Sequence, residues 1–209
     1  MPNPTVTYAP NGPYMVRGLT DLRNSKGETL AVKPVMALCR CGGSASKPFC
    51  DGSHKTNGFS DANLGGSAKP VRKTYLGKHI AIQDDRSICA HAGYCTEGLA
   101  AVFNSETKPW INPDNATVDE IAATIRRCPS GALSYSIGEV NGPEPGAEAA
   151  IEVTKDGPYG VMGHCELVNV PLAADAPANR YTLCRCGASK NKPFCDGSHW
   201  DASFKDERN

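Results

Sequence analysis

The sequence lacks the features that mark membrane-spanning, nucleic-acid-binding and secreted proteins. No run reaches about eighteen consecutive apolar residues, so no segment is expected to span a membrane. Basic and acidic residues balance at 22 each, without a basic cluster interleaved with aromatics, so we expect neither nucleic acid nor a membrane surface as a partner. The opening MPNPTVTYAPNGPY has neither a basic start nor an apolar stretch. We therefore expect no secretory signal and a cytoplasmic protein.

The motifs of the common enzyme classes are also missing. The sequence contains no nucleophile elbow, no P-loop and no glycine fingerprint for a dinucleotide. No pattern of a substrate pocket replaces them. We therefore do not expect a catalytic residue or an enzyme acting in its own right.

Cysteine, in contrast, is abundant, with ten residues in the chain. Because no secretion signal is present, disulfides are the weaker explanation for them. Nine of the cysteines fall into three groups of three, and Cys165 is left over as a small residue that we expect to be buried. Three sets of three indicate metal ligation. The groups are Cys39, Cys41 and Cys50; Cys89, Cys95 and Cys128; and Cys184, Cys186 and Cys195.

Two of these groups belong to an internal repeat. CRCGGSASKPFCDGSH occupies residues 39–54, and CRCGASKNKPFCDGSH occupies 184–199, an offset of 145. With the same offset, residues 12–61 align with 157–206 without a gap and with 24 identities in 50 positions. The two copies therefore share a fold as well as a motif. Each is expected to consist of a few short strands, the first at 6–10 or 151–155, followed by a ligand loop.

A different unit separates the two copies. Its clearest element is a helix in TVDEIAATIRR, where Thr117 and Glu120 form a capping-box pattern. This helix should end before Pro129, because a proline disfavours the helical conformation of its predecessor. A shorter helix is expected at 96–103. Strands are expected at 79–82 and 132–136.

These patterns predict an α+β protein of three small modules. We expect a β-rich unit at 1–62, an α+β unit at 71–138 and a second β-rich unit at 150–209. Gly-, Pro- and Ala-rich stretches at 61–70 and 138–150 are typical of linkers between them. Units of this size bury little core, so bound metal would act as a staple.

The repeated motif offers two pairs of ligands in each copy. A C-x-C pair places two thiolates close enough to bind one metal. The third cysteine and the histidine are four residues apart, which on a helix puts them on one face, able to close on a second metal. Three cysteines and a histidine also suit a single tetrahedral zinc, although zinc sites usually space a cysteine pair by two to four residues. Both alternatives stay open on spacing alone.

The full pattern C-x-C-x2-S-x3-P-x-C-D-G-S-H resembles the signature of the CDGSH iron–sulfur proteins, the NEET family. The resemblance implies a NEET-type fold and one 2Fe–2S cluster in each copy, with one iron on the C-x-C pair and the other on the third cysteine and the histidine. It also implies that the copies pair about a two-fold axis, which tandem copies could do within a single monomer. The implied ligands are Cys39, Cys41, Cys50 and His54, and Cys184, Cys186, Cys195 and His199.

The third group resembles the cysteines of a bacterial ferredoxin that holds one cluster. Cys89 and Cys95 match its first and third positions, and Cys128-Pro129 matches its distal one. Ala92 stands at the middle position, so one thiolate is missing. The resemblance leaves a 3Fe–4S cluster, a 4Fe–4S cluster with a ligand other than cysteine, and an empty site as alternatives. His91 is the candidate for a fourth ligand, against the simpler reading of a surface histidine.

Three functions follow as hypotheses. The first is electron transfer by a multi-cluster carrier, with a redox protein as partner. The second is delivery of clusters to an apo iron–sulfur protein, or redox and pH sensing, because a histidine ligand titrates near neutral pH. The third is a zinc-stapled interaction module with no redox role. Arg40 and Arg185, each between two thiolates, are expected either to offset negative charge or to be solvated.

Overall fold

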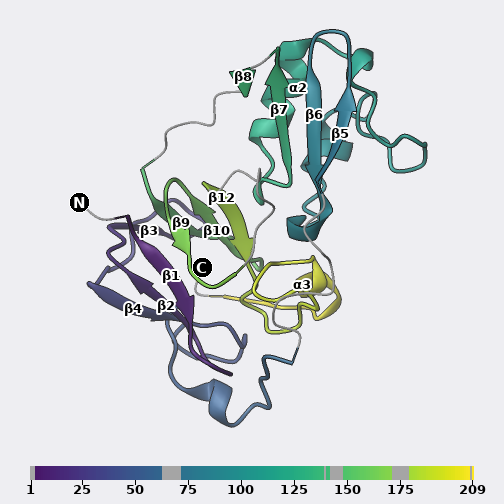
Figure 1. Cartoon of the computed structure of the whole chain (residues 1–209). Coiled ribbons are helices and arrows are strands. Elements are labelled where there is room, and N and C mark those ends of the chain that lie inside the picture. The colour runs from purple at the N-terminus through teal and green to yellow at the C-terminus, as the bar shows by residue number, and fades with distance from the viewer. Residues whose placement is uncertain (1–2, 63–71, 139, 142–147, 171–178, 208) are drawn as a thin grey trace.

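The fold has two hydrophobic cores, one shared by the two repeated units and one inside the middle unit. The computed structural model describes residues 3–62, 72–138, 140–141, 148–170, 179–207 and 209 (Figure 1). Most of each stretch predicted as a linker, 61–70 and 138–150, lies outside the described residues. The protein is α+β, with mostly strands and few helices, which confirms the predicted fold class.

The two repeated units form two four-stranded sheets, and each sheet takes strands from both copies. Within each sheet, three antiparallel strands come from one copy and a short parallel edge strand comes from the other. The first sheet has the order β11 (Glu166–Leu167), β1 (Thr5–Tyr8), β2 (Tyr14–Arg17) and β4 (Val35–Leu38). The second has the order β12 (Arg180–Leu183), β10 (Tyr159–Met162), β9 (Ala150–Val153) and β3 (Asp21–Arg23).

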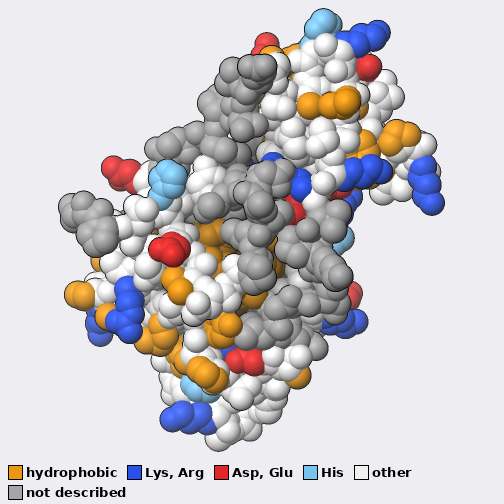
Figure 2. Space-filling model, in the orientation of Figure 1, with side chains coloured by type: hydrophobic (Ala, Val, Ile, Leu, Met, Phe, Trp, Pro, Cys, Tyr) orange, Lys and Arg blue, Asp and Glu red, His pale blue; other side chains and the backbone are white. Residues whose placement is uncertain are grey.

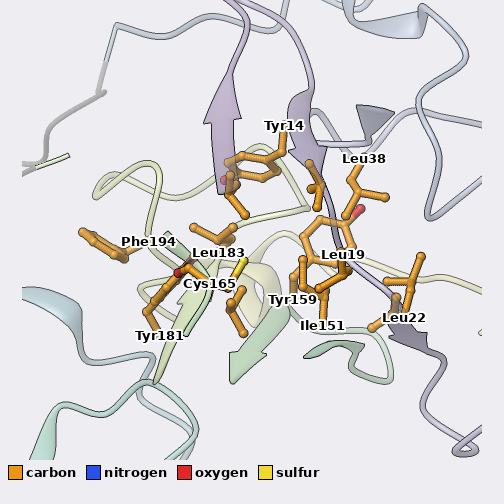
Figure 3. Packing of buried hydrophobic residues seen from close by; sticks show 14 of the residues in the cluster. Tyr14, Leu19, Leu22, Leu38, Ile151, Tyr159, Cys165, Tyr181, Leu183 and Phe194 are labelled. Atoms are coloured by element: carbon orange, nitrogen blue, oxygen red, sulfur yellow. Dashed lines mark hydrogen bonds between the residues drawn. The ribbon is translucent and has the colours of Figure 1, made fainter. Parts of the chain in front are cut away.

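Strand β3 joins the sheet of the second copy, and β11 joins the sheet of the first. The two repeated units, which the sequence suggests are separate, therefore form one body. Figure 3 shows the reason, because Leu22 and Leu38 of the first copy pack in one cluster with Ile151 and Leu183 of the second. A unit of about 60 residues buries too little apolar surface to be comfortably stable alone, and a shared core answers that shortage. Cys165 lies in this core and is 1% exposed, as predicted.

The middle unit is an antiparallel sheet packed against one main helix. Its sheet runs β5 (Arg72–Leu76), β6 (Ala81–Asp85), β7 (Leu133–Ile137) and β8 (Val140–Asn141). The predicted strands at 79–82 and 132–136 correspond to β6 and β7. Helix α2 (Val118–Arg126) begins with the predicted capping box, in which the Thr117 hydroxyl accepts from the amide of Glu120 and the Glu120 carboxylate accepts from the amide of Thr117.

The second predicted helix is shorter than expected. Helix α1 covers only Tyr94–Gly98, whereas the sequence suggests a helix over 96–103. Leu99 leaves the helical conformation, and Phe103 forms a β-bridge with Ile111 instead. Both of these bridge residues are buried in the core of the middle unit, so tertiary packing overrides the local helical pattern.

On the face shown in Figure 2, basic and acidic side chains of the described residues are dispersed among polar and apolar ones. A search of the described residues finds no helix long and apolar enough to cross a membrane.

Candidate metal centres

The C-x-C cysteines lie immediately after the last strand of each copy, β4 or β12. The two sulfur atoms are 3.8 Å apart in the first copy and 3.6 Å apart in the second. Two thiolates bound to one tetrahedral metal at about 2.3 Å are separated by roughly 3.8 Å. Each pair is therefore spaced to hold one metal ion.

The third cysteine and the histidine form a second pair. In each copy the cysteine Sγ lies 3.4 Å from the histidine Nδ1, so Nδ1 is the ring nitrogen that faces the cysteine. The histidine is the second residue of a short turn that follows a glycine in the left-handed conformation, the 3₁₀ turn Ser53–Lys55 or α3 (Ser198–Asp201). The glycine, and not the aspartate before it, occupies the N-cap position. The aspartate carboxylate accepts a hydrogen bond from the amide of the serine that begins the turn.

Two separated pairs fit a two-metal group better than a single zinc ion. Among the described residues, which include all eight of these ligands, no three His, Cys, Asp or Glu side chains gather closely enough to hold one ion. A tetrahedral zinc would need all four donors around a single point. A 2Fe–2S cluster needs two donors at each of two irons, and this is how the donors are grouped.

The protonation of the thiols also points to a bound cation. The Sγ of Cys39 shares a hydrogen bond with that of Cys41, which lowers the pKa of Cys41 to about 5 and raises that of Cys39. In the second copy the pKa of Cys186 falls to about 7, and burial raises the pKa of Cys195 to about 12. The protein thus prepares one thiolate in each C-x-C pair. The raised pKa values of Cys39 and Cys195 mean that these thiols lose their protons more readily when a cation compensates the charge.

The structure assigns Arg40 and Arg185 a third role that the sequence does not suggest. Both side chains are buried, with each residue 1% exposed, and each Nε donates to the carbonyl of the glycine at the β-turn of its own copy. Each also forms an ion pair with an aspartate near the end of its copy, Asp61 or Asp206. The arginines are therefore buried clamps that tie the ligand loop to its own copy.

The third set of cysteines lines one cavity of about 370 Å³ in the middle unit. Cys89, Cys95 and Cys128 all face it, and burial raises the pKa of Cys89 and of Cys95. The Arg86 guanidinium lies 3.4 Å from the Sγ of Cys89, a contact that favours a thiolate. The space, three converging sulfurs and a cation beside one of them fit an iron–sulfur cluster. His91 lines the same cavity and is exposed, and so is Ala92 at the position of the missing cysteine.

This cavity lies directly against the second copy. The Asn191 side chain donates to the carbonyl of Ser87, and the Arg180 side chain donates to the carbonyl of Cys128 at 3.2 Å. At Gly197, a Cβ would lie 3.3 Å from the Cβ of His91, so the CDGSH turn and the cavity rim touch. Figure 1 shows α3 beneath the middle sheet accordingly. Sequence reasoning offers no signal for this contact.

Comparison with known families matches both kinds of site. The model of the iron-binding zinc finger of CDGSH type matches residues 11–55 and 156–200, and that of a divergent 4Fe-4S mono-cluster domain matches 75–138. The chain is a tandem CDGSH-domain protein with a divergent 4Fe-4S mono-cluster domain between the two copies. Its two CDGSH copies flank a divergent single-cluster domain, as the sequence suggests, and it is an iron–sulfur protein.

Curated relatives match only part of this CDGSH protein. The uncharacterized protein YjdI of Escherichia coli K12 is 41% identical over 63 residues, which cover 30% of this chain and 83% of YjdI. The YjdI protein of Escherichia coli O157:H7 matches to the same extent. No solved structure matches the chain.

Replacing the candidate histidine ligand of either CDGSH copy with cysteine is expected to lower the reduction potential of the 2Fe–2S cluster in that copy. Two ferric ions, two sulfides and three thiolates carry one net negative charge, and a fourth thiolate adds another. Histidine ligands raise the potential of 2Fe–2S centres, so we expect His54→Cys or His199→Cys to lower it by on the order of 100 mV. Potentiometric titration followed by EPR measures this shift. An unchanged potential would refute the histidine ligand.

Proposed function

We propose that this protein carries single electrons between a reductase and an acceptor protein, through two 2Fe–2S clusters and one 3Fe–4S or 4Fe–4S cluster. Cys39, Cys41, Cys50 and His54, with their counterparts Cys184, Cys186, Cys195 and His199, would hold the first two. Cys89, Cys95 and Cys128 would hold the third, with His91 as candidate fourth ligand. A bound cluster supplies a one-electron centre, and the chain sets its position, charge and exposure. We propose a cytoplasmic monomer that acts as a carrier and not as an enzyme.

The contiguity of the three sites carries this proposal. Cys41 and Cys186 face each other in an antiparallel β-bridge, so the two CDGSH loops meet. Cys89 and Cys128 of the middle cavity pack against the core that also holds Leu183 and Phe194 of the second copy. The second copy thus lies between the other two sites. Neighbouring sites with different ligands would have different reduction potentials, which favours stepwise transfer of an electron from one cluster to the next.

The test is EPR on the anaerobically purified protein, as isolated and after dithionite, with iron and sulfide quantified. We expect about seven or eight iron ions per chain, from two plus two plus three or four. A signal before reduction would indicate a 3Fe–4S centre. Silence before reduction, with a cubane signal afterwards, would indicate 4Fe–4S and make His91→Ala the next variant. Iron for only the two 2Fe–2S clusters would contradict the relay.

The exposure of the first copy favours a second candidate function, the delivery of clusters to an apo iron–sulfur protein. Cys50 and His54 are partly exposed, whereas Cys195 and His199 are buried. An exposed histidine ligand is open to exchange with water or with an acceptor's ligands. Incubation with an apo-ferredoxin separates the two functions. Transfer of the cluster supports delivery, and retention supports the carrier.

A further inference from the structure

Two buried tyrosines cross between the CDGSH copies. Tyr14 begins β2 of the first copy, and Tyr159 begins β10 of the second, at the repeat offset of 145. Both residues are 0% exposed, and their rings meet edge to face with centroids 6.2 Å apart (Figure 3). Burial raises the pKa of both phenols, so both keep the proton that they donate.

Each hydroxyl serves the ligand loop of the opposite copy. Tyr14 Oη lies 2.9 Å from the carbonyl oxygens of both Cys184 and Pro193. Tyr159 Oη lies 2.9 Å from the carbonyl oxygen of Cys39 and 3.0 Å from that of Pro48.

The two accepting carbonyls belong to the two arms of one loop. The first carbonyl is that of the leading C-x-C cysteine. The second is that of the proline two residues before the third cysteine. One tyrosine hydroxyl therefore links the two arms of the opposite loop, and each arm would hold one of the two irons.

The ligand loops are also linked through the buried arginines. Arg40, inside the first loop, lies over the ring of Tyr14 at 5.5 Å, and Tyr14 supports the second loop. Arg185, inside the second loop, lies over Tyr159 at 5.7 Å, and Tyr159 supports the first. The arginine of each loop therefore packs on the tyrosine ring whose hydroxyl donates to the other loop.

We propose that Tyr14 and Tyr159 are crossed positioning residues, each of which holds together the cluster site of the other CDGSH copy. A tyrosine-to-phenylalanine change keeps the ring and its packing. It leaves a buried carbonyl without this donor, and an unpaired buried polar group is costly. The loss should appear in the opposite copy and not in the copy that carries the change. The inference concerns how the sites are held, so it does not depend on electron transfer.

The test uses full-length chains that keep one CDGSH site. Cys184→Ser with Cys186→Ser leaves the first copy's site, and Cys39→Ser with Cys41→Ser leaves the second copy's. In the chain that keeps the first site, we expect Tyr159→Phe to shorten the half-life of the visible absorbance of its 2Fe–2S cluster, with that of the middle cluster subtracted, by roughly tenfold, as a lost buried hydrogen bond would. Tyr14→Phe should leave it nearly unchanged there, and the pattern should reverse in the other chain.

A matched control removes a buried hydroxyl that touches neither loop. Tyr181 is 0% exposed and donates to the carbonyl of Cys165 at 2.9 Å. Tyr181→Phe should lower overall stability without the crossed pattern. The proposal is overturned if each tyrosine affects its own copy, if both affect both copies alike, or if Tyr181→Phe matches them.

Amide hydrogen exchange gives a readout that needs no cluster. In the otherwise unchanged apo chain, Tyr14→Phe should speed exchange in peptides covering 184–195 and spare 39–50, and Tyr159→Phe should do the reverse. If neither single-site chain binds iron, the assignment of the metal sites fails, but exchange still decides the role of the tyrosines. Equal exchange in the two loops would overturn it.

Discussion

The cluster of the first CDGSH copy is expected to leave the protein about tenfold faster than that of the second, a difference of about 1.4 kcal/mol in activation free energy. The ligand sets are identical, so only the surroundings differ. His199 is 6% exposed, whereas His54 is partly exposed. The Trp200 ring covers His199 with centroids 4.7 Å apart, and the middle unit touches the adjacent Gly197. Attack on the second histidine must first displace these groups.

The measurement compares the two single-site chains, in which one C-x-C pair is changed to serine. Loss of visible absorbance is followed in the presence of a chelator at constant pH, and then with an apo-ferredoxin as acceptor. Once the contribution of the middle cluster is subtracted, the parent chain should lose its two 2Fe–2S clusters in two phases that match the two single-site rates. Equal rates, or a faster loss from the second copy, would contradict the shielding argument.

The two copies differ at one exposed position beside the histidine, so exchanging the residues there tests the shielding argument. Lys55 of the first copy stands at the position of Trp200 in the second. Lys55→Trp should slow loss from the first copy, and Trp200→Lys should speed it from the second. Both positions are exposed, so neither change should alter the core.

The spacing of the candidate ligands was predictable because metal chemistry is local. A C-x-C pair and a cysteine four residues before a histidine fix donor spacing within one loop. The structure spaces them in the predicted pairs. The strands of β6 and β7 and the capping box at Thr117 were predictable for the same reason, since each depends on near neighbours in sequence.

The contacts between copies were not predictable from such patterns. Nothing in the sequence of β3 says that it will pair with β9 of the other copy, since its single apolar residue, Leu22, could pack on either sheet. Arg40 was expected to offset negative charge between the two thiolates or to be solvated, yet it pairs with Asp61 and is buried between the rings of Tyr8, Tyr14 and Phe59. Its partners come from both ends of the copy, so only the closed fold reveals the role.

The second large effect is expected for Gly131→Ala, a change at the contact between the middle unit and the second copy. Gly131 has a φ of +65°, and a Cβ there would lie 2.7 Å from the carbonyl oxygen of Arg180. That clash is with backbone, so the two units must move apart. We expect the spin–spin interaction between the reduced middle cluster and that of the second copy to weaken or vanish in EPR. Loss of the second copy's cluster should accelerate toward the rate of the first.

Gly138→Ala separates this effect from backbone strain. Gly138 also has a positive φ, +59°, but nothing lies within 4 Å of a Cβ placed there. Both alanines carry the left-handed penalty of about 1–2 kcal/mol, and only Gly131→Ala adds the clash. Both variants should lose thermal stability, Gly131→Ala more than Gly138→Ala, and altered spin coupling in Gly131→Ala alone would show that the contact connects the two sites. Unchanged coupling in both variants would contradict the prediction, because the clash would then have been absorbed without changing the distance between the centres.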